Sequence, residues 1–306
     1  MEQNNDYSVV IIGSGPAALT AAVYCGRYDL KTIVIGEVSG GTLSRASEIG
    51  NWPGIEKISG IELTKNMITH VKSLGIEVVT RKIDNIRKDG NEFIVEGRNI
   101  SVRAKKVILA TGTKPRQLNI PREEEFIGSG ISYCNTCDGI YFKDKVVAVV
   151  GGGNSGCSSA NELTGIASKI HLLCAEPKFM FAEPARIKQI ENNPKIEKYF
   201  NASIIELLGE NKLEGIKLND GTIIKVSGVF VEIGLIPNKE FLSTIGLTLN
   251  KDGYVIADKK MRTNIPGLFS AGVVNEGTFA QAITSAAEGA VAANTAYGEI
   301  KSETNV

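Results

Sequence analysis

Two segments of the sequence share one pattern, a short apolar strand followed by a glycine turn and small residues. Residues 8–18 read SVVIIGSGPAA, and residues 146–156 read VVAVVGGGNSG. A second apolar strand follows each copy, at 32–35 in the first and at 170–173 in the second. We expect the intervening helices over 19–28 and 157–167. Such strand–helix–strand units open a doubly wound parallel sheet, so the chain must contain two of these sheets.

Both turns fit the dinucleotide-binding spacing GxGxxG/A. Its first two glycines permit the turn and the approach of a pyrophosphate, and the third small residue lets helix and strand pack. A lone motif is weak evidence, but two copies in matching contexts indicate one domain for a flavin dinucleotide and one for a nicotinamide dinucleotide. A duplicated fold with only one working site remains the alternative for the second copy. The matching residues are Gly13, Gly15 and Ala18, then Gly151, Gly153 and Gly156.

The second copy is predicted to be an insertion within the first domain. Strand-like alternation over 76–109 leads to a linker at 113–117, and a strand at 228–233 meets a second crossing at 234–238. The chain then returns through 263–272 to a helix of small residues over about 279–297. We therefore predict an α/β protein with two Rossmann-like (doubly wound, three-layer ββα) nucleotide-binding domains. Residues 1–116 and 239–306 would form the FAD-binding domain, and 117–238 the inserted domain.

Composition argues against several classes of partner. The 306 residues include 34 basic and 34 acidic side chains, so no overall field favours nucleic acid or an anionic membrane. The longest apolar run near the start, Val9–Ile12, is too short for a signal peptide or a membrane span. Five cysteines, an odd number, are untypical of a secreted disulfide framework. We expect a cytoplasmic protein.

Cys134 and Cys137 form a CxxC pair that is followed directly by Asp138. Such a pair can open and close a small disulfide, with one sulfur attacking a partner's disulfide and the other resolving the intermediate. The adjacent acid offers a proton to a leaving thiolate. CxxC is also half of a zinc site, but no second CxxC or CxxH follows, and the only histidines are His70 and His171. We therefore favour a redox dithiol over a metal site or two structural cysteines.

With these residues together, the chain resembles the low-molecular-weight thioredoxin reductases over nearly its whole length. The resemblance implies bound FAD, a homodimer, a dithiol in the inserted domain, and thioredoxin or a thioredoxin-like protein as partner. The shared segments are GSGPAA at 13–18, GG-L at 40–43, NWPG at 51–54, ATG at 110–112, SYCNTCDG at 132–139, GGGNSG at 151–156, IGLIPN at 233–238 and AQAI at 280–283.

The resemblance also implies roles for individual residues. Cys137 would face the flavin, Cys134 would attack the protein substrate, and Asp138 would protonate the substrate's departing dithiol. The alternative for Asp138, a helix N-cap beside the cysteines, is compatible with that catalytic role. The residues expected around FAD are Gly13, Ser14, Gly15, Pro16, Ala17, Glu37, Gly41, Thr42, Leu43, Asn51, Thr111, Gly112, Gly272, Val273, Ala280, Gln281 and Ala282.

The sequence departs from the family where NADPH users carry arginines for the ribose 2′-phosphate. Ala175, Glu176 and Met180 stand at those places, and a carboxylate there repels a phosphate. Glu176 follows Gly151 by 25 residues (176 − 151), near where a Rossmann unit places the acid that binds an unphosphorylated ribose. A solvated loop carboxylate is the equal alternative. The candidate second nucleotide site comprises Gly151, Gly153, Asn154, Ser155, Gly156 and Glu176.

NADPH is thus disfavoured as electron donor, and we expect NADH, ferredoxin or another carrier to be the donor. In this respect the chain resembles the branch of the family without the arginine clamp. On the flavin side, Val273 replaces the usual aspartate, Ala280 an arginine and Thr42 a glutamine. Losing one hydrogen bond costs on the order of 1 kcal/mol, so FAD binding should survive. We predict a flavin-dependent thioredoxin reductase. The alternatives are a redox-sensing flavoprotein that binds partners without turnover and a reductase of a small disulfide or peroxide system.

Overall fold

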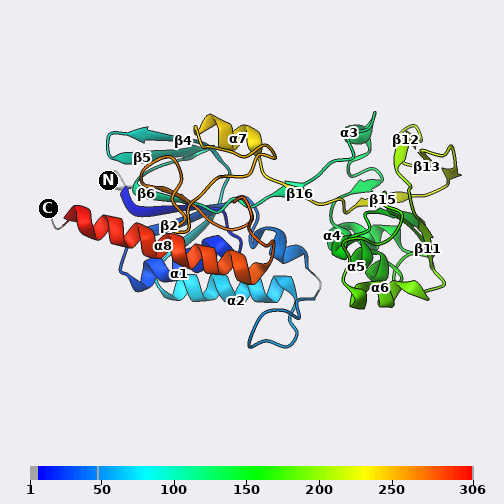
Figure 1. Cartoon of the computed structure of the whole chain (residues 1–306), viewed down its shortest axis with the longest axis horizontal. Helices are drawn as coiled ribbons and strands as arrows, with labels where there is room; N and C mark the ends of the chain where they lie inside the picture. The colour runs from blue at the N-terminus through cyan, green and yellow to red at the C-terminus, as the bar shows by residue number, and fades with distance from the viewer. Residues whose placement is uncertain (1–5, 47, 305–306) are drawn as a thin grey trace. The chain divides into compact units, whose positions relative to one another are not determined.

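The computed structural model describes residues 6–46 and 48–304, which divide into two compact units. The first comprises the chain up to Lys114 and from Ile236 onward, and the second comprises Pro115–Leu235. The sequence placed these boundaries after residues 116 and 238. Figure 1 shows the chain leaving the first unit and returning to it after the second is complete.

The first unit is built on a seven-stranded sheet in the order β3-β2-β1-β6-β5-β4, with β17 paired to the end of β6. Neighbours among β1, β2, β3, β6 and β17 are parallel, whereas β4, β5 and the first half of β6 form an antiparallel meander. The strands are β1 (Asp6–Ile12), β2 (Thr32–Gly36), β3 (Glu77–Thr80), β4 (Ile83–Asp89), β5 (Glu92–Gly97), β6 (Ile100–Leu109) and β17 (Leu268–Ser270). The helices are α1 (Pro16–Arg27), η1 (Gly41–Arg45), α2 (Gly60–Ser73), α7 (Lys239–Thr244) and α8 (Ala282–Thr304).

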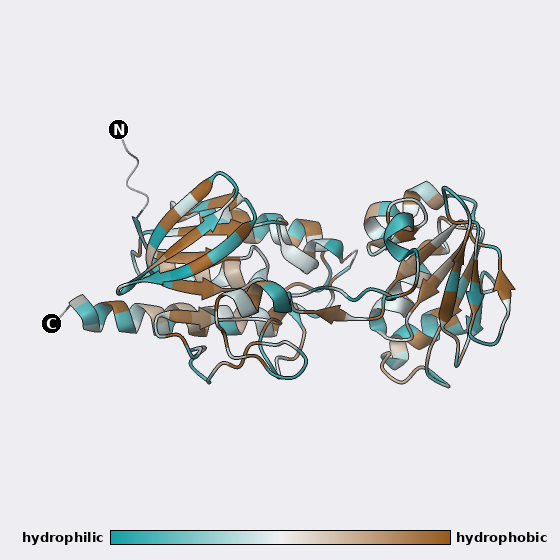
Figure 2. Cartoon of the chain, turned by 90° about the horizontal axis from the view of Figure 1, so that it is seen from above, coloured by the Kyte–Doolittle hydropathy of each residue, from teal (hydrophilic) through white to brown (hydrophobic). Residues whose placement is uncertain are grey.

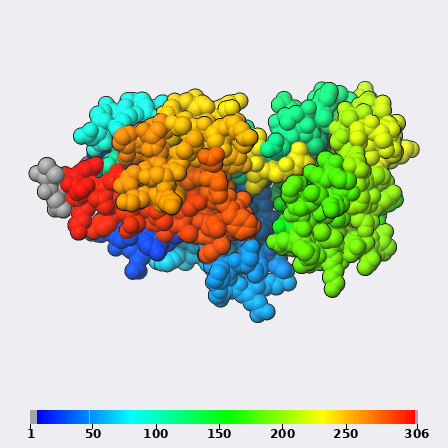
Figure 3. Space-filling model, in the orientation of Figure 1, coloured from blue at the N-terminus to red at the C-terminus, as the bar shows by residue number. Residues whose placement is uncertain are grey.

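Alternation along β1 gives this unit a core on each face of its sheet. Val9 and Ile11 pack with α1 and α8, whereas Val10 and Ile12 pack with the meander and α7. All four side chains are buried, as expected where both faces of a parallel sheet are covered. Figure 1 shows the resulting layers, with α1, α2 and α8 on one face of the sheet and α7 on the other. In Figure 3 the surface of α8 (red) continues into that of the segment before it (orange).

The second unit repeats this plan on a smaller scale. Its five-stranded parallel sheet has the order β11-β10-β9-β15-β8, and β12-β13-β14 form a separate antiparallel sheet. The strands are β8 (Ile131–Ser132), β9 (Val146–Val150), β10 (Lys169–Leu173), β11 (Ile196–Tyr199), β12 (Ile204–Leu208), β13 (Gly215–Leu218), β14 (Ile223–Ile224) and β15 (Gly228–Val231). The helices are α3 (Glu123–Phe126), α4 (Asn135–Asp138), η2 (Gly139–Phe142), α5 (Asn154–Leu163) and α6 (Pro184–Glu191).

The central strand of this unit also divides its side chains between two cores. Val147 and Val149 of β9 contact the α5 side, and Ala148 and Val150 contact the antiparallel sheet. In Figure 2 the strands of both units are predominantly brown, the colour of hydrophobic residues. The predicted α/β fold with two Rossmann-like units is confirmed.

Some element boundaries differ from those expected. Helix α1 begins at Pro16 and α5 at Asn154, three residues before the predicted starts, because proline is well accommodated at the first helical position and the turn residues themselves adopt helical geometry. The segment predicted as a plain linker contains β7 (Lys114–Pro115), which pairs with β16 (Leu235–Ile236). None of the helices within 6–46 and 48–304 combines the length and the apolar character that crossing a membrane requires.

Candidate active site

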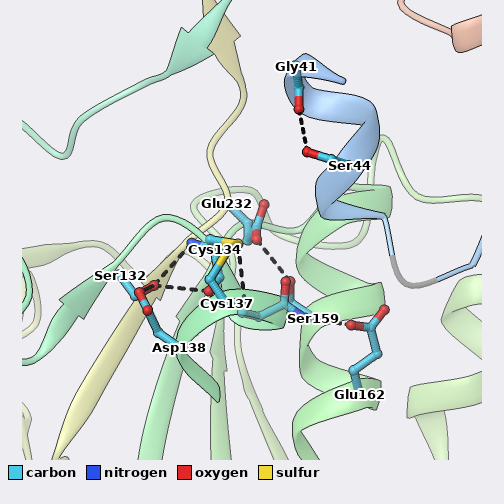
Figure 4. Close-up of a disulfide and its surroundings, with 10 residues drawn as sticks. Gly41, Ser44, Ser132, Cys134, Cys137, Asp138, Ser159, Glu162 and Glu232 are labelled. Atoms are coloured by element: carbon cyan, nitrogen blue, oxygen red, sulfur yellow. Dashed lines mark hydrogen bonds between the residues drawn. A yellow bond between two sulfur atoms is a disulfide. The ribbon is translucent and has the colours of Figure 1, made fainter. Parts of the chain in front are cut away.

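The CxxC pair lies in a tight turn at the end of β8. Cys134 and Cys137 form a disulfide with their Cα atoms 5.3 Å apart. Cys134 is the N-cap of α4, and its Sγ accepts a hydrogen bond from the Cys137 amide at 3.2 Å. Cys134 is half-buried and Cys137 is exposed, so the disulfide lies at the surface of its unit. Figure 4 shows the disulfide with the residues around it.

Three half-buried hydrogen bonds hold this turn in place. The Ser132 hydroxyl donates to the Asp138 carboxylate at 2.6 Å and lies 3.0 Å from the Cys134 amide nitrogen. On the other side, Asn135 Nδ2 donates to Glu162 Oε2 on α5 at 2.6 Å. The dithiol turn is therefore attached both to its own strand and to the helix that follows the second glycine turn.

The three remaining cysteines are buried free thiols. Burial raises the pKa of Cys25 to about 12 and that of Cys174 to about 11, and it also raises the pKa of Cys157. Since the thiolate is the reactive form, these thiols are poor nucleophiles at neutral pH. Thiol chemistry in this chain is concentrated at Cys134 and Cys137.

In the first unit, the glycine turn between β1 and α1 has two kinds of glycine. Gly13 has φ +118°, and a Cβ on it would lie 2.1 Å from the Ala110 carbonyl oxygen. Gly15 is extended, and a Cβ on it would come no closer than 3.8 Å to its nearest neighbour, the Gly40 carbonyl oxygen. Packing therefore requires glycine at 13, whereas Gly15 leaves open the space in front of the α1 N-terminus. That is the space a pyrophosphate would take.

The other residues expected around FAD gather at the same edge of this sheet, where the parallel strands end. Glu37 follows β2 and is exposed, Thr111 and Gly112 follow β6, and Gly272 and Val273 follow β17. Ligands of doubly wound sheets bind at this carboxyl edge. Ser14, Pro16 and Ala17 belong to the glycine turn and α1, and Gly41, Thr42 and Leu43 to η1. Ala280 and Gln281 directly precede α8, and Ala282 is its first residue.

Two contacts at this edge bear on whether a flavin dinucleotide fits. Asn51 Nδ2 donates to Gln281 Oε1 at 2.9 Å, which joins two predicted residues that are 230 positions apart. The buried Thr113 Oγ1, next to Gly112, is one of the side-chain oxygens without a hydrogen-bond partner in the described part of the chain. Since buried polar groups are normally satisfied, this hydroxyl and the open Gly15 fit a polar ligand here.

The second glycine turn also contains glycines that packing requires and one that it does not. A Cβ on Gly151 (φ +134°) would lie 2.2 Å from Glu232 O, and one on Gly156 would lie 1.9 Å from Gly151 O. Gly153 is extended, and no atom lies within 4 Å of its Cβ position. Gly151 and Gly156 are thus required by packing alone, whereas Gly153 is not.

The chain's own segment 178–183 runs along this turn. The Phe181 backbone forms a bridge with Gly153, and the Glu183 amide donates to Asn154 Oδ1 at 2.7 Å. Ser155 lies in the first turn of α5. Backbone contacts from this segment therefore lie beside the second turn, although the Cβ position of Gly153 itself stays open.

The described segment 175–183, which follows β10, contains no arginine. The half-buried Glu176 accepts a hydrogen bond from Cys174 Sγ at 3.3 Å, and its neighbour Ala175 is exposed. Met180 is 53% exposed and apolar. Within this same described segment, Lys178 is the only cation. Segment 175–183 therefore carries carboxylates, Glu176 among them, and no guanidinium.

The family described as pyridine nucleotide-disulphide oxidoreductase matches residues 7–289. The chain belongs to this family. A thioredoxin reductase of Listeria monocytogenes is 36% identical over 298 residues, which cover 95% of this chain and 92% of the relative. A crystal structure of Lactococcus lactis thioredoxin reductase in the FR conformation has a TM-score of 0.91 at 34% identity, covering 97% and 99% of the two chains. A ferredoxin-flavin thioredoxin reductase from Clostridium acetobutylicum has a TM-score of 0.54 at 30% identity, with the same coverage.

This membership confirms the resemblance to the low-molecular-weight thioredoxin reductases and the prediction of a flavoprotein oxidoreductase. The roles assigned to individual residues of this pyridine nucleotide-disulphide oxidoreductase remain predictions.

Sequence reasoning missed Glu288 of α8. Its carboxylate accepts hydrogen bonds from the Gly272 amide at 2.8 Å, from Asn275 Nδ2 at 3.0 Å and from Thr278 Oγ1 at 2.7 Å. It thereby fixes the loop after β17, where the family resemblance implies an aspartate in place of Val273. The absence of that aspartate was the one signal that could have prompted a search for another carboxylate.

Proposed function

We propose that this protein is a flavin-dependent thioredoxin reductase, in which the Cys134–Cys137 dithiol passes electrons to thioredoxin or a thioredoxin-like protein. The surface disulfide with Asp138 directly beside it is the observation that carries the proposal. The names of the relatives support it, since the Listeria and Lactococcus proteins are both thioredoxin reductases.

FAD is the proposed cofactor of the first unit. The α1 N-terminus with Gly15 would receive the pyrophosphate, Glu37 the adenosine ribose, and the loops after β6 and β17 the rest of the molecule. Bound FAD would supply reversible two-electron reduction of the Cys134–Cys137 disulfide. The open Gly15 and the Thr113 hydroxyl, which lacks a partner among the described residues, support this placement.

Within the dithiol we propose that Cys137 faces the flavin and Cys134 attacks the substrate disulfide. Cys134 Sγ already accepts a hydrogen bond from the Cys137 amide, a contact that would also stabilise a thiolate on that sulfur. Asp138 would then protonate the departing thiolate of the substrate.

We further propose a donor other than NADPH. Ala175, Glu176 and Met180 provide no bidentate contact for a phosphate, and the Glu176 charge opposes one. Glu176 instead suits the free ribose hydroxyls of NADH, and Gly153 leaves room for a pyrophosphate. Electron delivery by ferredoxin is the other candidate, supported by the likeness to a ferredoxin-flavin thioredoxin reductase.

A donor panel tests this part of the proposal. Purified protein is mixed anaerobically with NADH, NADPH or reduced ferredoxin, and the loss of flavin absorbance is followed. We expect slow bleaching by NADPH, and faster bleaching by NADPH in the Ala175→Arg/Glu176→Arg variant. Glu191→Arg, on α6, is a control for an added positive charge elsewhere in the unit. Rapid bleaching of the unaltered protein by micromolar NADPH would overturn the donor proposal.

The substrate, assembly and location are proposed on the same family basis: a cytoplasmic homodimer that acts on thioredoxin. Light scattering during gel filtration measures the assembly. Thioredoxin turnover is measured with chemically reduced protein, so that it does not depend on the donor. A reduced protein that leaves oxidised thioredoxin unchanged would refute the proposed function and favour a redox sensor.

A further inference from the structure

The Ser132 hydroxyl joins both ends of the dithiol turn. Ser132 ends β8 and is 4% exposed. Its Oγ lies 2.6 Å from Asp138 Oδ2 and 3.0 Å from the amide nitrogen of Cys134. Figure 4 marks these contacts with dashed lines. The Cys134 carbonyl oxygen is farther away, at 3.2 Å.

The directions of these hydrogen bonds follow from the chemistry of the groups. A serine hydroxyl has one proton to donate, and a carboxylate at 2.6 Å is a stronger acceptor than a carbonyl at 3.2 Å. Ser132 therefore donates to Asp138 and accepts from the Cys134 amide. The amide, the hydroxyl and the carboxylate form a chain in which each hydrogen bond polarises the next.

The two carboxyl oxygens of Asp138 are in different situations. Within 6–46 and 48–304, Ser132 is the one side chain hydrogen-bonded to the Asp138 carboxyl, and the contact is made at Oδ2. Asp138 is half-buried, so its carboxyl group has limited contact with water. Oδ2 is thus engaged as an acceptor, and Oδ1 is the oxygen available to carry a proton.

We propose that Ser132 is a positioning residue for the proton transfer that accompanies thiol–disulfide exchange, an inference that rests on the proposed function. The Cys134 thiolate attacks one sulfur of the substrate, so that a Cys134–substrate disulfide forms and the substrate's own disulfide breaks. The departing sulfur takes the proton from Asp138 Oδ1, and the carboxylate regains a proton from solvent after the exchange. The Cys137 thiolate then attacks the Cys134 sulfur, which restores the Cys134–Cys137 disulfide and releases the second substrate sulfur, protonated by solvent. Two electrons have passed from the dithiol to the substrate.

Ser159, in the same unit, is a suitable comparison for testing whether the role of Ser132 is purely structural. Ser159 of α5 is 3% exposed, and its hydroxyl donates to Glu232 Oε1 at 2.9 Å. Both serines satisfy a carboxylate in a buried setting, but the carboxylate that Ser159 satisfies does not adjoin the CxxC pair in sequence. If burial were the whole reason for Ser132, removing either hydroxyl would weaken the fold and leave the chemistry unchanged.

The test uses two kinds of disulfide that differ in their leaving group. Thioredoxin and hydroxyethyl disulfide release alkyl thiolates of ordinary pKa, which need a proton, whereas the aromatic disulfide DTNB releases a thiolate of low pKa that does not. Reduced holoprotein is mixed rapidly with each. We expect Ser132→Ala to slow exchange with the alkyl disulfides by about tenfold or more, and exchange with DTNB by less than about twofold. Ser159→Ala should change neither.

A double-mutant cycle shows whether Ser132 acts through Asp138. In an Asp138→Asn background, Ser132→Ala should add no further loss with alkyl disulfides, because the group it positions has been removed. Equal slowing with both kinds of disulfide, or a full additional loss in that background, would overturn the inference.

Folding and the proposed function are controlled separately. If Ser132→Ala unfolds, Ser132→Thr and Ser132→Val form a pair of nearly equal volume with and without the hydroxyl, and only the valine variant should be slow. If the unaltered protein reduces hydroxyethyl disulfide but not thioredoxin, the proposed function fails while the role of Ser132 is still measured.

Discussion

Alanine substitutions in the two glycine turns should distinguish glycines that the fold requires from glycines that leave room for a ligand. We expect Gly13→Ala and Gly151→Ala to destabilise their units, and Gly15→Ala and Gly153→Ala to leave stability nearly unchanged. Gly15→Ala should nevertheless weaken FAD binding, because its methyl group would enter the open space before α1.

The magnitudes follow from the local geometry. At Gly151 a side chain would hold φ at +134°, which costs about 1–3 kcal/mol, and its Cβ would overlap the Glu232 carbonyl oxygen at 2.2 Å. Glu232 cannot move freely, because its amide donates to Val150 O at 2.8 Å where β15 runs beside β9. Overpacking of this kind adds about 1–3 kcal/mol, so the total loss is on the order of 2–6 kcal/mol.

At Gly153 the opposing effects are small. Its backbone is extended and nothing lies within 4 Å of the Cβ position. Alanine lowers the entropy of the unfolded chain, worth about 0.4–1 kcal/mol, and is a poorer N-cap than glycine by a comparable amount. We therefore expect a change within about 0.5 kcal/mol. Gly15→Ala should likewise change stability little, because the Cβ position of Gly15 is also open. Gly13→Ala should destabilise the first unit as Gly151→Ala does the second, because a Cβ on Gly13 would lie 2.1 Å from Ala110 O.

Urea unfolding measures these differences. Trp52, the only tryptophan, reports on the first unit, and hydrogen exchange of peptides covering β9 and β15 reports on the second. FAD affinity is measured by titrating apoprotein with FAD. Gly153→Ala that destabilises as much as Gly151→Ala, or Gly15→Ala that binds FAD as tightly as the unaltered protein, would refute the reasoning.

Three further predictions concern other parts of the molecule. Cys137→Ser should trap a mixed disulfide between Cys134 and thioredoxin, seen by non-reducing electrophoresis and mass spectrometry; trapping by Cys134→Ser instead would reverse the two roles. Glu288→Gln should increase hydrogen exchange at the Gly272 amide and raise the FAD dissociation constant about fivefold to tenfold, because a charged acceptor is replaced by a neutral one; an unchanged constant would exclude a role in flavin binding. Burial lowers the pKa of His171, so the unfolded chain binds its proton more readily and stability should fall as pH drops below about 6.5. His171→Gln should have a shallower loss of stability between pH 7 and pH 5, and an unaltered slope would contradict this.

The fold could be predicted from the sequence because its determinants are local. A strand, a glycine turn and a helix of small residues recur in order, and the alternation of β1 and β9 fixes which side chains face each core. The starts of α1 and α5 were misplaced because proline and glycine read as turn residues, although both are accepted where a helix begins.

The candidate site could be predicted only where its residues are adjacent in sequence. The dithiol and Asp138 form one motif, whereas Ser132 contributes through a turn that brings its hydroxyl back to Asp138. Glu288 reaches Gly272 from 16 positions away on a different element. Hydrogen bonds of this kind depend on tertiary packing, which leaves no periodic signal in the sequence.

The pairing of β7 with β16 bears on whether the two units can be produced as separate proteins. The Arg116 amide donates to Gly234 O at 2.9 Å, so the chain enters and leaves the second unit at neighbouring points. A segment whose ends meet can be excised, and the cut edges of its host rejoined by a short loop, without stretching either piece. Residues 115–235 could then be produced alone as a colourless dithiol protein, whose reduction potential is measurable without flavin absorbance. The remaining residues, once rejoined, would form a flavoprotein without a redox disulfide.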